Sequence, residues 1–235
     1  MTAQSKIDIT DIIKAGNLKY LDEKINKVRA KETNNDALEA DVIEVLVSSL
    51  VEHGKNQNLI IQIAQISKVL AEGLGLNAKY CSLLEQAARV YDIGNTAISR
   101  KIYEKDDKLS FEEFEIVKNH TLIGYEILKV QHFESTDLGA LISAQHHEWF
   151  NGGGYPAQLK EDAIDISARI VAIADSVGIL FRNRPGRRAW GYDKIVDYIQ
   201  VRNSLQFDPE IVKVFLSHQK VIHDILQTNF VVKRR

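Results

Sequence analysis

The sequence predicts an all-α protein. Apolar residues recur at the α-helical period along most of the chain, and the polar or glycine-containing breaks between these segments are short. Strand signals are few, and Phe230–Val232 is the only short β-like run. With 13 glycines, 3 prolines and 45% apolar residues, the composition excludes a disordered linker, a collagen and a turn-dense β-sandwich.

Helices in the first half follow from apolar periodicity bounded by polar breaks. The polar stretch Lys31–Asn35 separates the first two, and Gly75 is a plausible stop for the third. The fourth predicted helix ends next to Asp92, so Asp92 is expected at a helix end. The predicted segments are Ile7–Leu21, Leu38–Val51, Ile60–Leu74 and Ala78–Tyr91.

The second half has clearer helix starts. Ser110–Glu113 has the Ser-x-x-Glu form of a capping box, and the helical spacing after it continues to Leu128, with His120 in the middle or at the end of a helix. Asp208 and Pro209 suit the N-cap and first position of a last helix that reaches about Leu226. The other predicted segments are Leu138–His147, Ser167–Phe181 and Tyr192–Val201, for roughly nine or ten helices in all.

Charge and cysteine content limit the partners. The 30 basic and 32 acidic residues leave a net charge of −2, so no long-range attraction to DNA or to an anionic membrane is expected. No apolar run is long enough to span a bilayer. Cys81 is the only cysteine, which excludes an intrachain disulfide and favours a reduced, cytoplasmic setting.

Five side chains could carry chemistry. His146 and His147 are adjacent at a predicted helix end, and the glycines that follow would let both bind one ion. Imidazole and carboxylate together suit Zn, Fe or Mn, so His120, Asp92 and Asp175 are candidate partners. By spacing alone, the histidine pair could instead be a surface pair with one packed ring, and Asp175 could form an ion pair between helices or a cap.

Several motifs, taken together and in order, resemble the HD-GYP family over about Val42 to Phe215. They are Asp92-Ile93-Gly94, Lys108 to His120, Gly124 with Ile127-Leu128, His146 to Pro156, Ala168 to Asp175, Arg184-Pro185, Ala189-Trp190 and Phe207-Asp208-Pro209. The resemblance implies a helical, metal-dependent phosphodiesterase that opens the bacterial messenger cyclic di-GMP, usually as a signalling output domain.

The resemblance also implies the roles of individual residues. Asp92 would bridge two metals and, with His120, act in catalysis if the protein is active. His120, His146 and His147 would bind one metal, and Asp175 would belong to the other. Arg184, Arg187 and Arg188 match basic residues that hold substrate phosphate, although a solvated basic turn is the alternative. The loop Gly154-Tyr155-Pro156 borders the site in the family and has been linked to partner contact.

The sequence departs from the family at the second metal. Tyr91 replaces the histidine of the His-Asp pair, and Leu59, or Asn58 after a one-residue slip, replaces an earlier histidine. The other departures are Asn95 for a lysine, Lys55 near a glutamate that holds a third metal in some members, and Gly178 for a second aspartate. A single divalent ion (Fe, Mn or Zn), or none, is therefore expected, with cleavage absent or very slow.

Three hypotheses follow. The first is a degenerate HD-GYP domain in cyclic di-GMP signalling that acts by binding this or a related dinucleotide, or a signalling protein. The second is an active phosphodiesterase with an altered metal site, and the third is a metal-free scaffold. Residues 1–40 are predicted to be an N-terminal helical extension, able to mediate a homodimer, ahead of the domain at 41–235.

Overall fold

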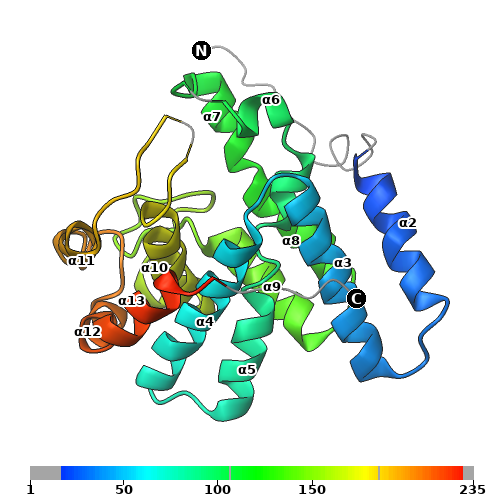
Figure 1. The fold of residues 1–235 in the computed structure, drawn as a ribbon, viewed down its shortest axis with the longest axis horizontal. Coiled ribbons are helices and arrows are strands. Elements are labelled where there is room, and N and C mark those ends of the chain that lie inside the picture. The colour runs from blue at the N-terminus through cyan, green and yellow to red at the C-terminus, as the bar shows by residue number, and fades with distance from the viewer. Residues whose placement is uncertain (1–16, 106, 185, 230–235) are drawn as a thin grey trace.

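The structure is a computed structural model that describes residues 17–105, 107–184 and 186–229. Within these ranges every regular element is helical, and the β pairings are two isolated bridges, Arg184 with Arg187 and Asn203 with Phe207. The all-α prediction is confirmed (Figure 1). The predicted β-like run at Phe230–Val232 and the first part of the helix predicted from Ile7 lie outside the described residues.

Asparagine caps set the starts of three early helices. The side chains of Asn34, Asn56 and Asn77 accept hydrogen bonds from backbone N–H groups in the first turn of the helix that follows each of them. Two of these helices therefore begin earlier in the sequence than the apolar residues predicted, at Asn35 and Gln57. The first elements are α2 (Asn17–Arg29), α3 (Asn35–Glu52), α4 (Gln57–Gly73) and α5 (Ala78–Ala87).

Helix α5 ends at Ala87, so the prediction that it reaches Tyr91 was wrong. The N–H groups of Arg89, Val90 and Ile93 each bond to the carbonyl three residues earlier, which tightens the chain into a turn and then into the 3-10 helix η1 (Ile93–Ala97). Asp92 therefore lies on a turn between α5 and η1 rather than on a helix.

The later elements confirm the predicted starts but add two breaks. The capping box at Ser110 is present in both directions, and Asp208 caps a helix with Pro209 in its first turn. The helix expected to run on past the capping box instead breaks at Asn119, whose side chain donates to the carbonyls of Glu115 and Ile116, and the last helix breaks at His218. The elements are α6 (Arg100–Tyr103), α7 (Phe111–Lys118), α8 (His120–Lys129), α9 (Glu134–Gln145), η2 (Glu161–Ala163), α10 (Ile166–Leu180), α11 (Tyr192–Val201), α12 (Pro209–Ser217) and α13 (Gln219–Gln227).

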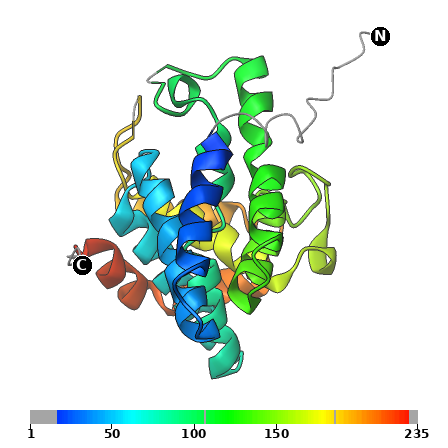
Figure 2. The ribbon, with the colours of Figure 1, turned by 90° about the vertical axis from the view of Figure 1, so that its right-hand side faces the viewer.

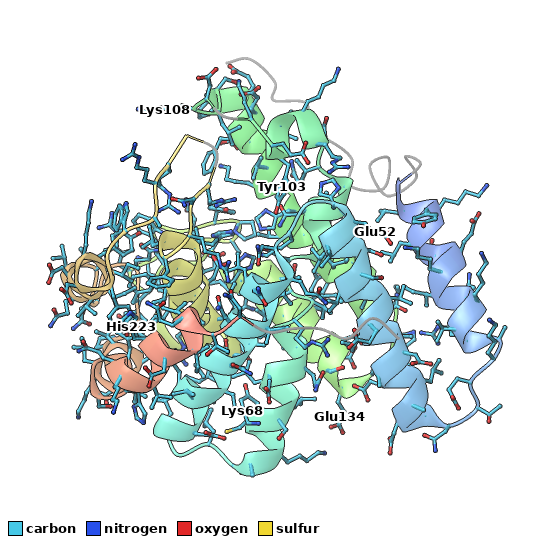
Figure 3. All side chains as sticks on the ribbon, in the orientation of Figure 1. Glu52, Lys68, Tyr103, Lys108, Glu134 and His223 are labelled. Atoms are coloured by element: carbon cyan, nitrogen blue, oxygen red, sulfur yellow. The ribbon has the colours of Figure 1, made fainter. Side chains whose placement is uncertain are left out.

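Two apolar clusters form the core and meet at the chain around Asp92. One is built mainly from α4, α5 and α10–α13, and the other mainly from α2, α3, η1 and α8. Tyr91 belongs to the first cluster and Ile93 to the second, so Asp92 lies where the two meet. Figure 3 shows Tyr103 nearer the middle of the view, with Lys108 at the upper end of the molecule and Glu134 at the lower end.

Helix α2 packs along α3 (Figures 1 and 2). Its apolar side, formed by Leu18, Leu21 and Ile25, is buried in the second cluster. The division at residue 40 and a homodimer through these helices stay predictions. Across the described part of the chain, every helix is too short or too polar to cross a bilayer.

Candidate metal centre

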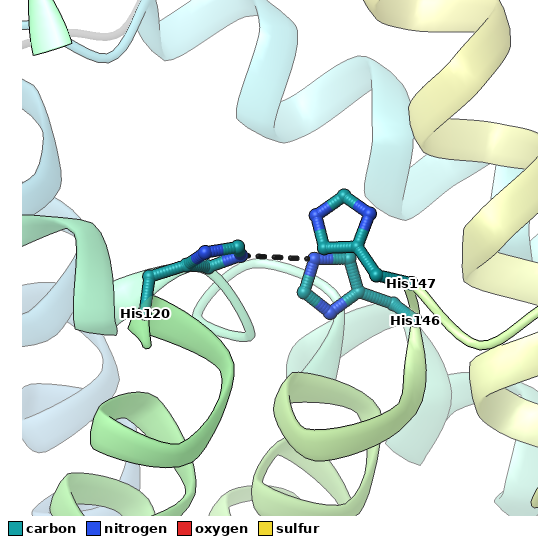
Figure 4. Close-up of side chains that lie close together, drawn as sticks. All are labelled: His120, His146 and His147. Carbon is teal, nitrogen blue, oxygen red and sulfur yellow. Dashed lines mark hydrogen bonds between the residues drawn. The ribbon is translucent and has the colours of Figure 1, made fainter. Parts of the chain in front are cut away.

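Three histidines lie close together, with their rings directed toward one another (Figure 4). His120 begins α8, and His146 and His147 follow directly after the last residue of α9. One ring nitrogen from each lies within 4.8 Å of those of the other two. His120 and His146 are only 3% and 4% exposed, and His147 is half-buried, so the pair is not fully exposed to solvent.

Backbone carbonyls orient two of these rings. Nδ1 of His120 lies 2.7 Å from the Val117 carbonyl oxygen, and Nδ1 of His146 lies 3.0 Å from that of Ile142. A carbonyl only accepts, so Nδ1 carries the proton in each neutral ring and Nε2 presents a lone pair to the pocket. Burial lowers the pKa of His120 to about 4 and that of His147 well below its usual value, which keeps both rings neutral at pH 7.

Asp92 completes a set of converging acceptors. The two Nε2 atoms of His120 and His146 are 3.4 Å apart, and Oδ1 of Asp92 lies 3.5 and 3.6 Å from them. Lone pairs that face each other without a proton between them favour a cation. Imidazole nitrogens and a carboxylate oxygen are ligands that Zn, Fe and Mn accept, so the residues present fit a divalent transition metal.

Gly94 allows Asp92 to approach the histidines. A Cβ atom at residue 94 would lie 1.9 Å from the His120 carbonyl oxygen and 2.6 Å from the Gly124 nitrogen. Both are backbone atoms, so no side-chain movement could make room. A glycine here therefore brings η1 against the start of α8 and sets Asp92 beside His120.

The other side of Asp92 holds a lysine. Lys55 Nζ forms a buried ion pair with Oδ2 of Asp92, the carboxylate oxygen that does not face the histidines. Burial opposes ionisation of Asp92, but Lys55, with His120 and His146, holds the pKa of that carboxyl well below its usual range. The pKa of Lys55 is raised in spite of burial, because Asp92 and Asp175 favour its charged form.

Asp175 lies in the same pocket, in the middle of α10. Its Oδ1 accepts a 2.5 Å hydrogen bond from the Tyr91 hydroxyl. From the sequence, an ion pair between helices or a helix cap was the alternative to a metal at this position. Burial raises the pKa of Asp175, and it raises that of Tyr91 well above the usual phenol value. The phenol therefore stays protonated as the donor.

Leu59 and Gly178, two positions at which the sequence departs from the family pattern, lie against each other. A Cβ atom at Gly178 would lie 2.8 Å from Leu59 Cδ1 and 3.1 Å from Ile63 Cγ1. The Leu59 side chain thus lies against the position where a longer residue at 178 would stand. Asn95, at the position of the expected lysine, donates its amide to the Asp92 carbonyl at 3.2 Å.

The loop at Gly154-Tyr155-Pro156 packs against His147. The Tyr155 ring stacks on the His147 ring with centroids 4.7 Å apart, and the backbone N–H of Tyr155 donates to the His147 carbonyl. Buried Glu148 accepts from the N–H groups of Ala157 and Leu159, which anchors the loop. The predicted contact of this loop with a protein partner stays a prediction.

A cavity of about 740 Å³ opens above these groups. Of the three arginines predicted to hold phosphate, Arg184 lines it. Arg187 instead donates to the carbonyls of Ile179 and Leu180 at the end of α10, and Arg188 is exposed and does not line the cavity. Sequence reasoning overlooked Tyr103, Phe181 and Arg182 in the wall.

Comparison with known proteins identifies the fold. The sequence model of the family described as "HD domain" matches residues 40–211. The chain belongs to the HD domain family. Over 172 residues it is 34% identical to the cyclic di-GMP phosphodiesterase response regulator RpfG of Xanthomonas campestris pv. campestris, covering 73% of this chain and 46% of that protein. This confirms the resemblance to the HD-GYP type.

Other HD proteins agree. The cyclic di-GMP phosphodiesterase of Thermotoga maritima is 36% identical over 164 residues, 70% of this chain and 45% of that protein. The solved structure titled "Bd1817, a HDG"Y"P protein from Bdellovibrio bacteriovorus" has a TM-score of 0.60 at 18% identity, covering 97% of this chain and 75% of that one. The chain spans about half the length of these two curated relatives.

Neutral buried histidines predict an acid-labile HD domain. In the metal-free protein, unfolding frees His120 to take up a proton between its usual pKa of 6.5 and its folded pKa of about 4. Stability is therefore lost as the pH falls through this window, by about 3 kcal/mol from this residue. Urea unfolding in chelator at about pH 7.5 and about pH 5 should show about 2 kcal/mol of this loss, because pH 5 lies inside the window. A His120→Asn variant should lose less, and equal stability at both pH values would contradict neutral histidines.

Proposed function

We propose that this chain is a degenerate HD-GYP module that binds cyclic di-GMP or a related cyclic dinucleotide above a one-metal centre and cleaves it very slowly or not at all. The observation that carries the proposal is the division of the pocket at Asp92. One carboxylate oxygen faces the lone pairs of His120 and His146, and the other is bound to Lys55. A signalling protein that reads the bound state is the expected partner.

The first half of the pocket suits one divalent ion. His120, His146 and His147, with Asp92, would hold it, and when bound it supplies charge neutralisation and polarisation of a phosphoryl oxygen. The carbonyl bonds that orient His120 and His146 keep their Nε2 atoms directed at the ion position.

The cavity walls suit a dinucleotide. Its volume of about 740 Å³ is within the range of small-ligand sites. Tyr103 and Phe181 can stack on bases, and Arg184 can donate to phosphate oxygens. Arg182 also lines the cavity, where its guanidinium donates a hydrogen bond to the Gln62 side chain.

Slow cleavage follows from the second half of the pocket. Leu59 cannot bind a metal, and Tyr91 is protonated and bonded to Asp175. A reaction that relied on a second ion there would lose transition-state stabilisation, on the order of 10²–10³ in rate for each group lost. Asn95 cannot move a proton in place of a lysine, because an amide does not ionise near neutral pH.

The alternative is an active phosphodiesterase with an altered site. It is favoured by the presence of Asp92, the three histidines and Asp175 around one pocket, and by relatives that are named as phosphodiesterases. In that case Asp92 and His120 would be catalytic.

Calorimetry with cyclic di-GMP, combined with chromatography of the products, tests the proposal. Metal-loaded protein is expected to bind the dinucleotide without multiple turnover. Arg184→Ala should weaken binding about tenfold or more through loss of a charge-assisted bond. The matched variant Arg188→Ala, whose side chain is exposed outside the cavity, should bind like the wild type.

Other outcomes separate the hypotheses. Sustained hydrolysis that His146→Ala abolishes would establish the active enzyme instead. Absence of bound metal, of dinucleotide binding and of hydrolysis would leave the metal-free scaffold.

A further inference from the structure

We propose that Lys55 is a built-in cation of the metal centre: its ammonium group occupies the Asp92–Asp175 side of the pocket and restricts the centre to a single metal ion. The inference rests on the proposed one-metal centre and adds the residue that sets its stoichiometry. It stands on the position of Lys55, on its partners and on the groups that surround the position.

The backbone fixes where Lys55 lies. Helix α3 ends in a turn in which Gly54 has a φ of +112°, a conformation that favours glycine, and the Lys55 N–H bonds back to the Leu50 carbonyl at 3.0 Å. Asn56 then caps α4 by accepting the N–H of Leu59. With caps on both sides of it, Lys55 is directed into the pocket, where only 6% of its side chain is exposed.

Asp92 connects the two sides of the centre through its two oxygens. Oδ1 lies beside Nε2 of His120 and of His146, and Oδ2 binds Lys55 Nζ. The carboxylate thus lies between the position of a metal ion and an ammonium group, as a bridging carboxylate would lie between two ions.

The other groups around Nζ also favour a cation. Asp175 lies close enough to interact electrostatically with Lys55, and the Tyr91 ring centroid is 5.1 Å from Nζ. Two buried carboxylates near each other would repel without a positive charge between them. The ammonium supplies that charge with no exchangeable ion.

A second divalent ion would have to displace this arrangement. It would meet the like charge of Lys55, and it would find the Tyr91 hydroxyl already bonded to Asp175. Leu59, beside the same cavity, offers no ligand atom. Lysine in this position therefore excludes a second ion both by its charge and by its use of Asp92.

Metal stoichiometry tests the proposal independently of activity. Wild-type protein and Lys55→Arg, loaded with Mn²⁺ and desalted, are expected to contain one ion per chain and to give the electron paramagnetic resonance spectrum of an isolated Mn²⁺. Lys55→Glu adds a third carboxylate near Asp92 and Asp175, which suits Mn²⁺. It should contain two ions per chain and show a spin-coupled signal.

Matched variants control for charge and folding. Lys213→Glu makes the same charge change on the exposed surface of α12 and should retain one ion. Circular dichroism checks that each variant is folded. If Lys55→Glu does not fold, Lys55→Gln removes the ammonium with a smaller change, and a second Mn²⁺ should then appear on titration.

Two ions in the wild type, or one ion in the folded charge-removal variant, would overturn the role of Lys55 and leave the metal centre itself in place. No ion in the wild type would overturn the proposed function as well. The two failures are therefore distinguishable.

Discussion

Replacing His146 by alanine is expected to abolish metal binding. His146 supplies one of three converging imidazoles, and its Nε2 lies 3.6 Å from the Asp92 carboxylate. Loss of a group that only orients a ligand already costs about 10- to 100-fold in metal affinity, so loss of a ligand should cost about 100-fold or more.

Thermal unfolding with and without metal measures this loss. An ion present at about 100 times its dissociation constant stabilises the wild type by about 2.7 kcal/mol. For a chain of this length that raises Tm by roughly 5–10 °C. His146→Ala should show almost no rise. The comparison is made within each protein, so any packing lost with the ring cancels.

A histidine outside the centre provides the control. His223 on α13 stacks on Tyr192 with ring centroids 4.4 Å apart. His223→Ala should therefore keep the full metal-dependent rise in Tm. If His146→Ala kept it too, the three histidines would not be the metal site.

Gly94→Ala is expected to have the largest effect on folding. The added Cβ would meet the His120 carbonyl oxygen at 1.9 Å, so η1 and α8 would have to separate. Such a clash with backbone in a packed core costs about 3 kcal/mol or more, because no flexible side chain can yield. The same movement would carry Asp92 away from His120 and weaken metal binding.

Urea unfolding and metal analysis of this variant check both effects. Gly191→Ala is the matched control, since a Cβ there has no neighbour within 4 Å. Its cost should stay below about 1 kcal/mol, as expected for a helix N-cap position. A Gly94→Ala protein with wild-type stability and metal content would show that the close approach of η1 to α8 is not required.

Several parts of the fold could be predicted from the local sequence. Ser110 with Glu113 and Asp208 with Pro209 mark helix starts correctly, because a cap involves residues only a few positions apart. The helix over Tyr192–Val201 was predicted with its observed bounds. The breaks at Asn119 and His218 were missed, since the apolar period continues across both.

The sequence could predict that the histidine pair is of a kind that binds metal, but it could not predict the surroundings of the pair. Adjacent imidazoles at a helix end indicated a metal site, but a surface pair has the same spacing. The burial of His146 and its approach to His120, 26 positions away in sequence, come from the packing of α8 on α9. Similarly, Arg187 bonds to the end of α10 because the following turn folds back onto it.

The helices, their caps and the types of residue able to bind a metal can be predicted from short stretches of the chain, because periodicity and capping are local interactions. The charge balance of the pocket cannot be predicted in this way, because its charged groups come from distant parts of the chain. Lys55 and Asp92 are 37 positions apart, and Tyr91 and Asp175 are 84 apart. A lysine and a tyrosine acquire these partners only when the two apolar clusters pack against each other and remove them from water, so folding alone decided which side of Asp92 faces histidines and which faces an ammonium group.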